Sequence, residues 1–168
     1  MKISALEEYG LRVALQLAHQ EAGGSLSIQE IAEREGLSAA YVGKLLAMMR
    51  QAGLVRSARG RAGGYALARS AEQVSVGDVL RVFGGQVWDP AHCERHAGSV
   101  DSCVHLGLCS VRTLWGRLES IVEHLLSEVS LADLVAGRFP WSAAGAESAE
   151  GKPPELSPAT GPAAAPEG

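Results

Sequence analysis

The sequence lacks the features that would place it in or across a membrane. It has no apolar run approaching the roughly 20 residues that a membrane-spanning helix needs. Its N-terminal segment carries Glu7, Glu8 and Arg12, where a signal peptide would need an apolar stretch. Its three cysteines, an odd number, do not suit a disulfide framework. We therefore expect a cytoplasmic protein whose cysteines act as thiols or thiolates.

Signs of catalysis are also missing from the sequence. No Ser/His/Asp combination and no pair of carboxylates stands out, and three of the five histidines lie in the segment that holds the cysteines. The glycine-rich stretch 60–64 is not followed by the Gly-Lys-Ser/Thr of a P-loop. We therefore expect a protein that is not an enzyme.

Acidic residues are absent from one long stretch. From Tyr41 to Arg69 every charged side chain is positive, and these side chains are Lys44, Arg50, Arg56, Arg59, Arg61 and Arg69. The net charge of −4 does not contradict this, because most of it comes from glutamates near the end of the chain. Positive charge gathered in one region predicts contact with nucleic acid better than the total charge does. The alternative is an ordinary solvated basic face.

The same stretch lies in a regular series of helix signals. Serines that can cap a helix stand at Ser4, Ser27 and Ser38, and glycines that can end one stand at 23–24, 36 and 53. Glutamates three residues after the first two serines complete capping boxes. The third helix has a buried stripe at helical spacing, formed by Val42, Leu45, Leu46 and Met49. Residues 54–57 and 65–68 are then predicted as two short strands around an arginine-containing loop.

This order of elements predicts a mainly α-helical protein with a small β wing, in the winged helix-turn-helix arrangement. The third helix would enter the major groove of DNA, and the wing arginines would contact the adjacent minor groove or the backbone. We expect Ser38 and Tyr41 to hold the DNA backbone, and Lys44 to contact a phosphate or a guanine edge. The full predicted DNA-binding set is Ser38, Ala40, Tyr41, Lys44, Arg56, Arg59 and Arg61.

Beyond the wing we expect three more helices and a tail. One helix is capped by Ser75 and ends at 84–85, a long one runs from Ser110 to about Glu128, and a short one follows Ser130 and ends at Gly137. The long helix has a wide apolar face, which favours a homodimer over a merely well-buried core helix, and its repeat is Leu114, Leu118, Ile121 and Leu125. The predicted domains are a DNA-binding unit at 1–84, a cysteine segment at 85–109, a dimerisation unit at 110–137 and a disordered tail rich in Ala, Pro, Gly and Glu at 138–168.

The cysteine segment has the spacing C-x9-C-x5-C, formed by Cys93, Cys103 and Cys109. In a reducing cytoplasm such a trio can be a chance set of thiols, a thiol switch, a zinc site or an iron–sulfur site. The spacing differs from the paired CxxC motifs of a zinc ribbon. An iron–sulfur cluster normally needs four protein ligands, so one more would have to come from elsewhere.

Several motifs together resemble the Rrf-type family of winged helix-turn-helix regulators, to which the IscR, NsrR and RirA sensors belong. The motifs are Met1-Lys2-Ile3-Ser4 with Tyr9, the wing from Leu54-Val55 through Arg59-Gly60 to Gly63-Gly64-Tyr65, Ser75–Leu80, the three cysteines followed by Leu114-Trp115, and Ser130–Leu134. The resemblance spans Met1 to about Gly137. It implies homodimeric regulators of transcription whose affinity for DNA changes when an iron–sulfur cluster is lost, oxidised or nitrosylated.

By this resemblance, Cys93, Cys103 and Cys109 match the cluster cysteines of the family, and the cluster would be of the [4Fe-4S] or the [2Fe-2S] type. IscR has a ligand histidine three residues after its last cysteine, and here that position is Arg112, which cannot ligate. In NsrR-like members the fourth ligand is a carboxylate near the N-terminus, and Glu8 occupies that position. The competing candidates are His92, His96 and His105, and Glu8 itself can also be a solvated carboxylate in the first turn of a helix.

The expected function is therefore that of a homodimeric, cytoplasmic transcription regulator, with repression as the expected sign. It would bind a pseudo-palindromic operator in double-stranded DNA, under the control of an iron–sulfur cluster that senses redox state, nitric oxide, or iron or cluster supply. Two alternatives stay open. One is a cluster-free regulator of the same fold that uses a thiol switch, a metabolite or a partner protein, and the other is a zinc-binding structural protein.

Overall fold

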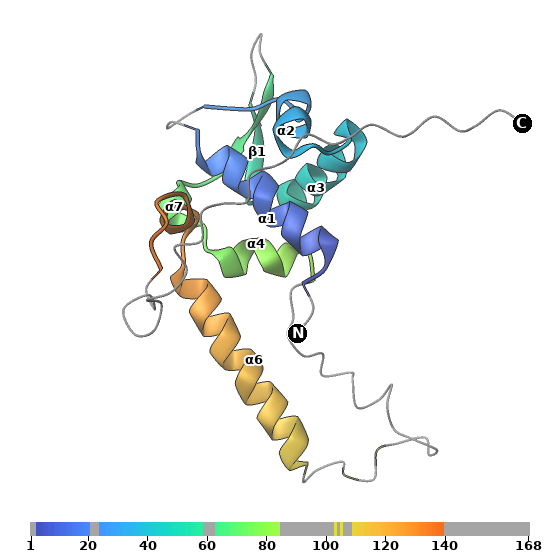
Figure 1. The fold of residues 1–168 in the computed structure, drawn as a ribbon, viewed down its shortest axis with the longest axis vertical. Coiled ribbons are helices and arrows are strands. Elements are labelled where there is room, and N and C mark those ends of the chain that lie inside the picture. The colour runs from blue at the N-terminus through green and yellow to red at the C-terminus, as the bar shows by residue number, and fades with distance from the viewer. Residues whose placement is uncertain are drawn as a thin grey trace, which may run out of the picture.

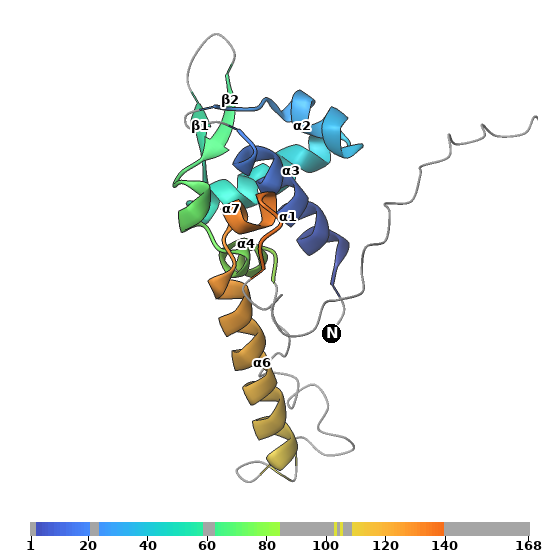
Figure 2. The same cartoon turned by 60° about the vertical axis from the view of Figure 1, so that its left-hand side comes forward.

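The computed structural model describes residues 3–20, 24–58, 63–84, 103, 105 and 109–139. Its helices are α1 (Ala5–Ala18), α2 (Ile28–Glu35), α3 (Ala39–Gln51), η1 (Ala71–Gln73, of the 3-10 type), α4 (Val76–Val82), α6 (Ser110–Glu128) and α7 (Leu131–Val135). Strands β1 (Val55–Ala58) and β2 (Gly64–Leu67) pair antiparallel, with Val55 opposite Leu67. The helical body has this ribbon at one end, and α6 extends away from the other end (Figures 1 and 2). None of the described helices is long and apolar enough to span a membrane.

Serine caps begin the helices where the sequence predicted them. Complete capping boxes open α1, α2, α4 and α7, and their serine–carboxylate pairs are Ser4/Glu7, Ser27/Glu30, Ser75/Asp78 and Ser130/Asp133. Hydrogen bonds from the backbone and hydroxyl of Ser27 hold the pKa of Glu30 below its ordinary value. Hydrogen bonds from Ser130 and then Arg138 lower the pKa of Asp133 in the same way. The predicted glycine ends are confirmed at Gly36, Gly53, Gly84 and Gly137, which all have positive φ angles.

Two boundaries differ from the prediction. The first helix ends at Ala18, with His19 as its C-cap, and does not reach the expected glycines at 23–24. The N–H of Gln20 turns back to the carbonyl of Leu17, which tightens the last turn and ends the helix early. Strand β1 begins one residue later than predicted, because the N–H of Leu54 bonds to the carbonyl of Met49 and completes the end of α3. Strand β2 begins and ends one residue earlier than predicted.

The core of the body lies between α1, α2, α3 and α7. The predicted stripe of α3 is fully buried, and its four residues Val42, Leu45, Leu46 and Met49 have no exposed surface. They share one cluster with Val13 and Leu17 of α1, Ile31 of α2 and Leu131 of α7. The sequence grouped the last helix with the long one, but in the structure Leu131 is as deeply buried as the α3 stripe.

A short backbone pairing joins α4 to the end of α6, and no sequence signal pointed to it. Ser75 and Ser130 form an isolated antiparallel bridge. The N–H of Val76 donates to the carbonyl of Val129, and the N–H of Leu131 donates to the carbonyl of Val74, both at 2.8 Å. The first turns of α4 and α7 therefore lie side by side. We call residues 74–78 and 129–133 the junction.

Substitution of Gly10 tests how tightly α1 packs on α4. A Cβ atom at Gly10 would clash with Cε2 of the buried Phe83 ring. We expect Gly10→Ala to lower the free energy of unfolding by about 1–3 kcal/mol, as overpacking does, in a urea titration followed by circular dichroism. Gly116→Ala is the control, because no atom lies within 4 Å of the added Cβ and alanine favours a helix interior by roughly 0.5–1 kcal/mol. Equal stability of the two variants would contradict this packing.

Candidate nucleic-acid interface and cysteine segment

The start of α3 exposes the residues that the sequence assigned to DNA. Ser38, Ala40 and Lys44 are exposed, and Tyr41 is half-buried. The hydroxyl of Ser38 accepts a hydrogen bond from the N–H of Tyr41 at 3.2 Å, so it caps the helix. The first two turns of α3 therefore combine small side chains with one lysine on an accessible surface.

Tyr41 is held in place by α1. Its ring meets the ring of Tyr9 edge-on, with centroids 5.9 Å apart. The guanidinium of Arg12 lies 5.5 Å from the centre of the Tyr9 ring, and its Nε donates to Oε2 of Glu35 at 2.6 Å. Sequence reasoning missed this chain of contacts, because Arg12 and Glu35 are 23 positions apart and no local pattern links them.

The wing is fastened to the body along its second strand. Leu26 and Tyr65 form a short antiparallel bridge, with N–H···O distances of 3.0 and 2.8 Å. A Cβ at Gly64 would lie 2.7 Å from the carbonyl oxygen of Leu26, so the two backbones are in close contact. Arg56 is exposed on β1. The predicted wing arginines Arg59 and Arg61 lie outside the described residues.

Two of the three cysteines lie in the described part of the chain. Cys103 and Cys109 are half-buried and carry free thiols. Cys109 is the N-cap of α6, where its Sγ accepts a hydrogen bond from the N–H of Arg112 at 3.4 Å. His105 is exposed, whereas Cys93, His92 and His96 lie outside the described residues. Among the residues described, no three His, Cys, Asp or Glu side chains form a group that could hold a metal ion.

Glu8 is exposed on the first turn of α1. Its neighbour Glu7 completes the capping box with Ser4, so Glu8 has no part in that cap. Within one chain the structure does not bring Glu8 to Cys109, because α1 belongs to the body and Cys109 begins α6 at the end that points away from the body (Figures 1 and 2).

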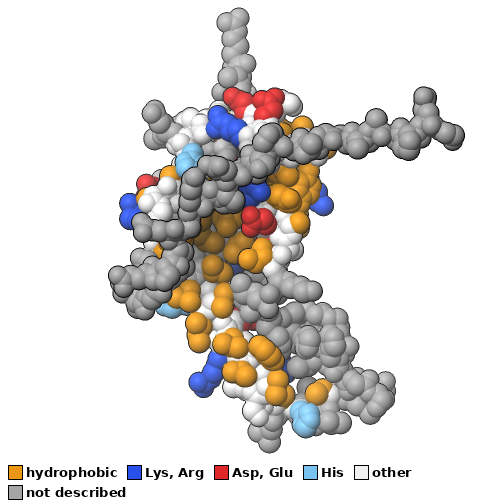
Figure 3. All heavy atoms as spheres, viewed as in Figure 1, with side chains coloured by type: hydrophobic (Ala, Val, Ile, Leu, Met, Phe, Trp, Pro, Cys, Tyr) orange, Lys and Arg blue, Asp and Glu red, His pale blue; other side chains and the backbone are white. Residues whose placement is uncertain are grey.

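The apolar face that the sequence predicted on α6 is an exposed surface in the single chain. None of the residues of α6 is buried. The exposed fractions of the predicted dimerisation residues are 53% for Leu114, 37% for Leu118, 56% for Ile121 and 38% for Leu125. Val111 and Trp115 are exposed beside them, and hydrophobic side chains follow α6 in the lower part of Figure 3. We call this set of six residues the α6 face.

Comparisons with known proteins agree with this geometry. Residues 3–137 match the model of the Rrf2 family, which is described as an iron-dependent transcriptional regulator. Protein rrf2 of Nitratidesulfovibrio vulgaris is 34% identical over 135 residues, which cover 80% of this chain and 87% of the relative. The solved structure of IscR from T. potens superposes with a TM-score of 0.64 at 33% identity, over 82% of this chain and 88% of that one. Staphylococcus aureus CymR, solved in an oxidized form, superposes with a TM-score of 0.59 at 34% identity, over 80% and 95%.

Other relatives, such as CymR of Bacillus subtilis and IscR of Serratia proteamaculans, are named HTH-type transcriptional regulators. Like the family description, these names are those of regulators and not of enzymes, as the sequence predicted. The solved structures of T. potens IscR and S. aureus CymR share the winged-helix arrangement of α1 to β2 found here. Because the match extends over nearly all of the described chain, the protein belongs to the Rrf2 family of DNA-binding transcription regulators.

Proposed function

We propose that the protein is a homodimeric repressor whose affinity for a pseudo-palindromic operator is controlled by an iron–sulfur cluster. One observation carries the proposal. Cys109, a predicted cluster ligand, is the N-cap of the helix whose α6 face is exposed. A change at the cysteine therefore acts directly on the helix through which two copies would associate.

The α6 face supports a homodimer. A row of large apolar side chains more than a third exposed is costly in water, and a second copy of the same face would cover it about a two-fold axis. Such a dimer would present two recognition helices α3, one to each half-site of a palindromic operator. Dimerisation would also bring the body of one subunit toward the cysteine segment of the other.

The donor set fits an iron–sulfur cluster. Cys103 and Cys109 are free and accessible thiols, and thiolates are the soft ligands that such clusters take. Together with Cys93 and one carboxylate or imidazole they would complete four ligands. When bound, the cluster would supply a centre that reacts with oxidants or nitric oxide. The family description as iron-dependent favours this reading over a structural zinc site.

Glu8 is our candidate for the fourth ligand, in competition with His92, His96 and His105. Glu8 is exposed, and the carboxylate that completes the cap of α1 belongs to Glu7. The helix α6 is about 28 Å long, which separates Cys109 from the body of its own chain. A carboxylate from the other subunit would therefore tie the two subunits together. Loss of that tie would shift the population of dimer geometries and so the spacing of the two α3 helices.

DNA contacts would come from α3 and the wing. Lys44 and Arg56 are exposed, and with Arg59 and Arg61 they would contact phosphates or base edges. Ser38 and Tyr41 would approach the DNA backbone through the N-terminal turn of α3, where free N–H groups favour phosphate. Ala40 would allow the close approach.

A cluster-free thiol switch is the second candidate, and one observation favours it. S. aureus CymR, which this chain resembles, has been solved in an oxidized form. In this chain hydrogen peroxide could oxidise Cys103 and Cys109 to one disulfide, with release of two water molecules. The proposed fold, dimer and DNA surface would be the same.

Lys44 is expected to contribute directly to DNA affinity. Lys44→Gln should weaken binding in a fluorescence anisotropy titration, tested with a duplex that the wild-type protein has enriched from a random pool. If Lys44 contacts a phosphate, the slope of log K against log salt should fall by about 1 in magnitude; if it contacts a guanine edge, discrimination between duplexes should fall instead. Arg117→Gln, on exposed α6, is the control for lost charge and should leave binding unchanged. Equal effects of the two substitutions would contradict a contact by Lys44.

Ile121 tests the dimer. Because its side chain is 56% exposed in the single chain, Ile121→Glu should leave the fold intact. In the dimer the new carboxylate would be buried without a partner, and we expect the dimer dissociation constant to rise by at least about ten-fold, or 1.4 kcal/mol, in sedimentation equilibrium. Ser120→Glu adds the same charge outside the α6 face and should not change association. An unchanged Ile121→Glu dimer would mean that another surface mediates association.

An absorption spectrum of protein purified without oxygen, with iron and sulfide analysis, tests the cluster. We expect a brown wild-type protein, and we expect Glu8→Ala to weaken or alter its visible bands. Glu33→Ala removes an exposed carboxylate from α2 and should leave the spectrum unchanged. A colourless protein that cannot be reconstituted with iron and sulfide would discard the cluster. Loss of two titratable thiols after peroxide treatment would then support the thiol switch.

A further inference from the structure

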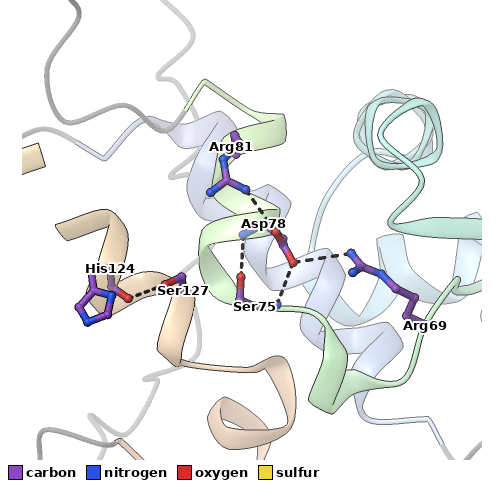
Figure 4. A network of polar contacts seen from close by, with 6 residues as sticks. All are labelled: Arg69, Ser75, Asp78, Arg81, His124 and Ser127. Carbon is purple, nitrogen blue, oxygen red and sulfur yellow. Dashed lines mark hydrogen bonds and ion pairs between the residues drawn. The ribbon is translucent and has the colours of Figure 1, made fainter. Parts of the chain in front are cut away.

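Asp78 lies where the wing, α4 and α6 meet. Its Oδ2 accepts the N–H of Ser75 at 3.3 Å in the capping box of α4, and the same oxygen lies 3.6 Å from Nη2 of Arg69. Its Oδ1 accepts a hydrogen bond from Nη1 of Arg81 at 3.2 Å. Figure 4 shows Arg69 reaching this carboxylate from one side, while the end of α6 with Ser127 lies on the other.

On the α6 side, Asp78 is fixed by the backbone. The neighbouring Gly77 packs so closely on the last turn of α6 that a Cβ there would lie 3.4 Å from backbone atoms of Leu126 and Ser127. The hydrogen bond from Val76 to Val129 holds the same turn. Asp78, Ser127 and Ser130 line one hollow of the surface. The position of the carboxylate therefore follows the position of α6.

On the wing side, Asp78 supplies a further attachment. The wing is a ribbon of two four-residue strands, and an isolated pair of strands is only marginally stable. The bridge from Leu26 to Tyr65 holds it laterally. Arg69 follows β2 by two residues, and its contact with Asp78 holds the base of the ribbon. Leu54 and Val55 at the start of β1 are buried in the core, and the contact of Arg69 with Asp78 adds an attachment at the end of β2.

We propose that Asp78 is a positioning residue for DNA binding, which fixes the direction of the wing relative to α6 by holding Arg69 at the wing base. The proposal uses only the DNA binding that belongs to the family, and neither the cluster nor the α6 dimer. It does not depend on stability, because both side chains of the pair are partly exposed and such ion pairs contribute little to folding. The consequence is in DNA binding, because specific contacts from α3 and from the wing have to be made together.

Asp78→Asn changes DNA affinity in opposite directions depending on whether Asp78 positions the wing or acts only as a negative charge near DNA. The asparagine Oδ1 can still accept the N–H of Ser75, so the helix cap is kept while the ion pairs with Arg69 and Arg81 are lost. If Asp78 positions the wing, we expect binding to a duplex enriched by the wild-type protein to weaken three- to ten-fold, with the salt slope unchanged. If Asp78 acts only as a negative charge near DNA, its removal should tighten binding to every duplex.

The comparison uses the enriched duplex and a random-sequence duplex of equal length, with one preparation method for all variants. The random duplex should bind Asp78→Asn as tightly as wild type or more tightly. Asp78→Glu keeps the cap and the charge and should restore the preference for the enriched duplex. An unchanged or tighter affinity of Asp78→Asn for the enriched duplex would overturn the proposal.

A second pair of variants keeps the test decisive if Asp78→Asn melts below the assay temperature. Arg69→Gln and Arg81→Gln each remove one positive charge and one ion pair from Asp78, but only Arg69 joins the wing. We expect Arg69→Gln to lose the preference for the enriched duplex by at least three-fold and Arg81→Gln to keep it. Equal preferences in the two variants would overturn the proposal.

Discussion

The backbone pairing at the junction holds α6 to the rest of the molecule. Two hydrogen bonds of 2.8 Å, from Val76 to Val129 and from Leu131 to Val74, join the end of α6 to the start of α4. None of the 19 residues of α6 is buried, so these bonds, the burial of Leu131 and the close packing of Gly77 provide its attachment. A helix fixed at one end in this way leaves the rest of its length available to another surface.

The body does not need α6 to complete its core. The stripe of α3 is already fully buried among α1, α2, β1 and α4, all of which contact α3. In the part of the chain that the structure describes, the apolar side chains of the α6 face keep exposed fractions of 37% to 59%, which are costly in water. A second copy of the chain is the partner that would bury this face with the symmetry that a palindromic DNA site requires.

Local chemistry made most of the fold predictable, and long-range pairing made the rest unpredictable. A serine followed three residues later by a carboxylate is visible in the sequence, and it located the starts of α1 and α2. The predicted bounds of α6 also agree with the structure. The bridge from Ser75 to Ser130 and the pair of Arg12 with Glu35 join distant positions and leave no periodic trace. The early end of α1 depends on a turn at Gln20, which propensity does not specify. The proposed ligand set, with Cys93 outside the described residues, stays a prediction from resemblance.

Both candidate sensing chemistries would act at the same position. Ligation or oxidation of Cys109 would change the atom that caps α6, because its Sγ accepts the N–H of Arg112. This change would occur at the end of α6 that lies far from the wing (Figure 1). A helix is stiff along its axis, so a shift at Cys109 would be passed to the junction, where Gly77 and Val76 contact the other end of α6. At the junction, the carboxylate of Asp78 contacts Arg69 at the base of the wing, so the shift would reach the wing. The sensing chemistry could therefore differ among relatives while the physical route from the cysteines to DNA stayed the same. Such a route requires that the α6 attachment has two alternative arrangements and that the state of the cysteines selects between them.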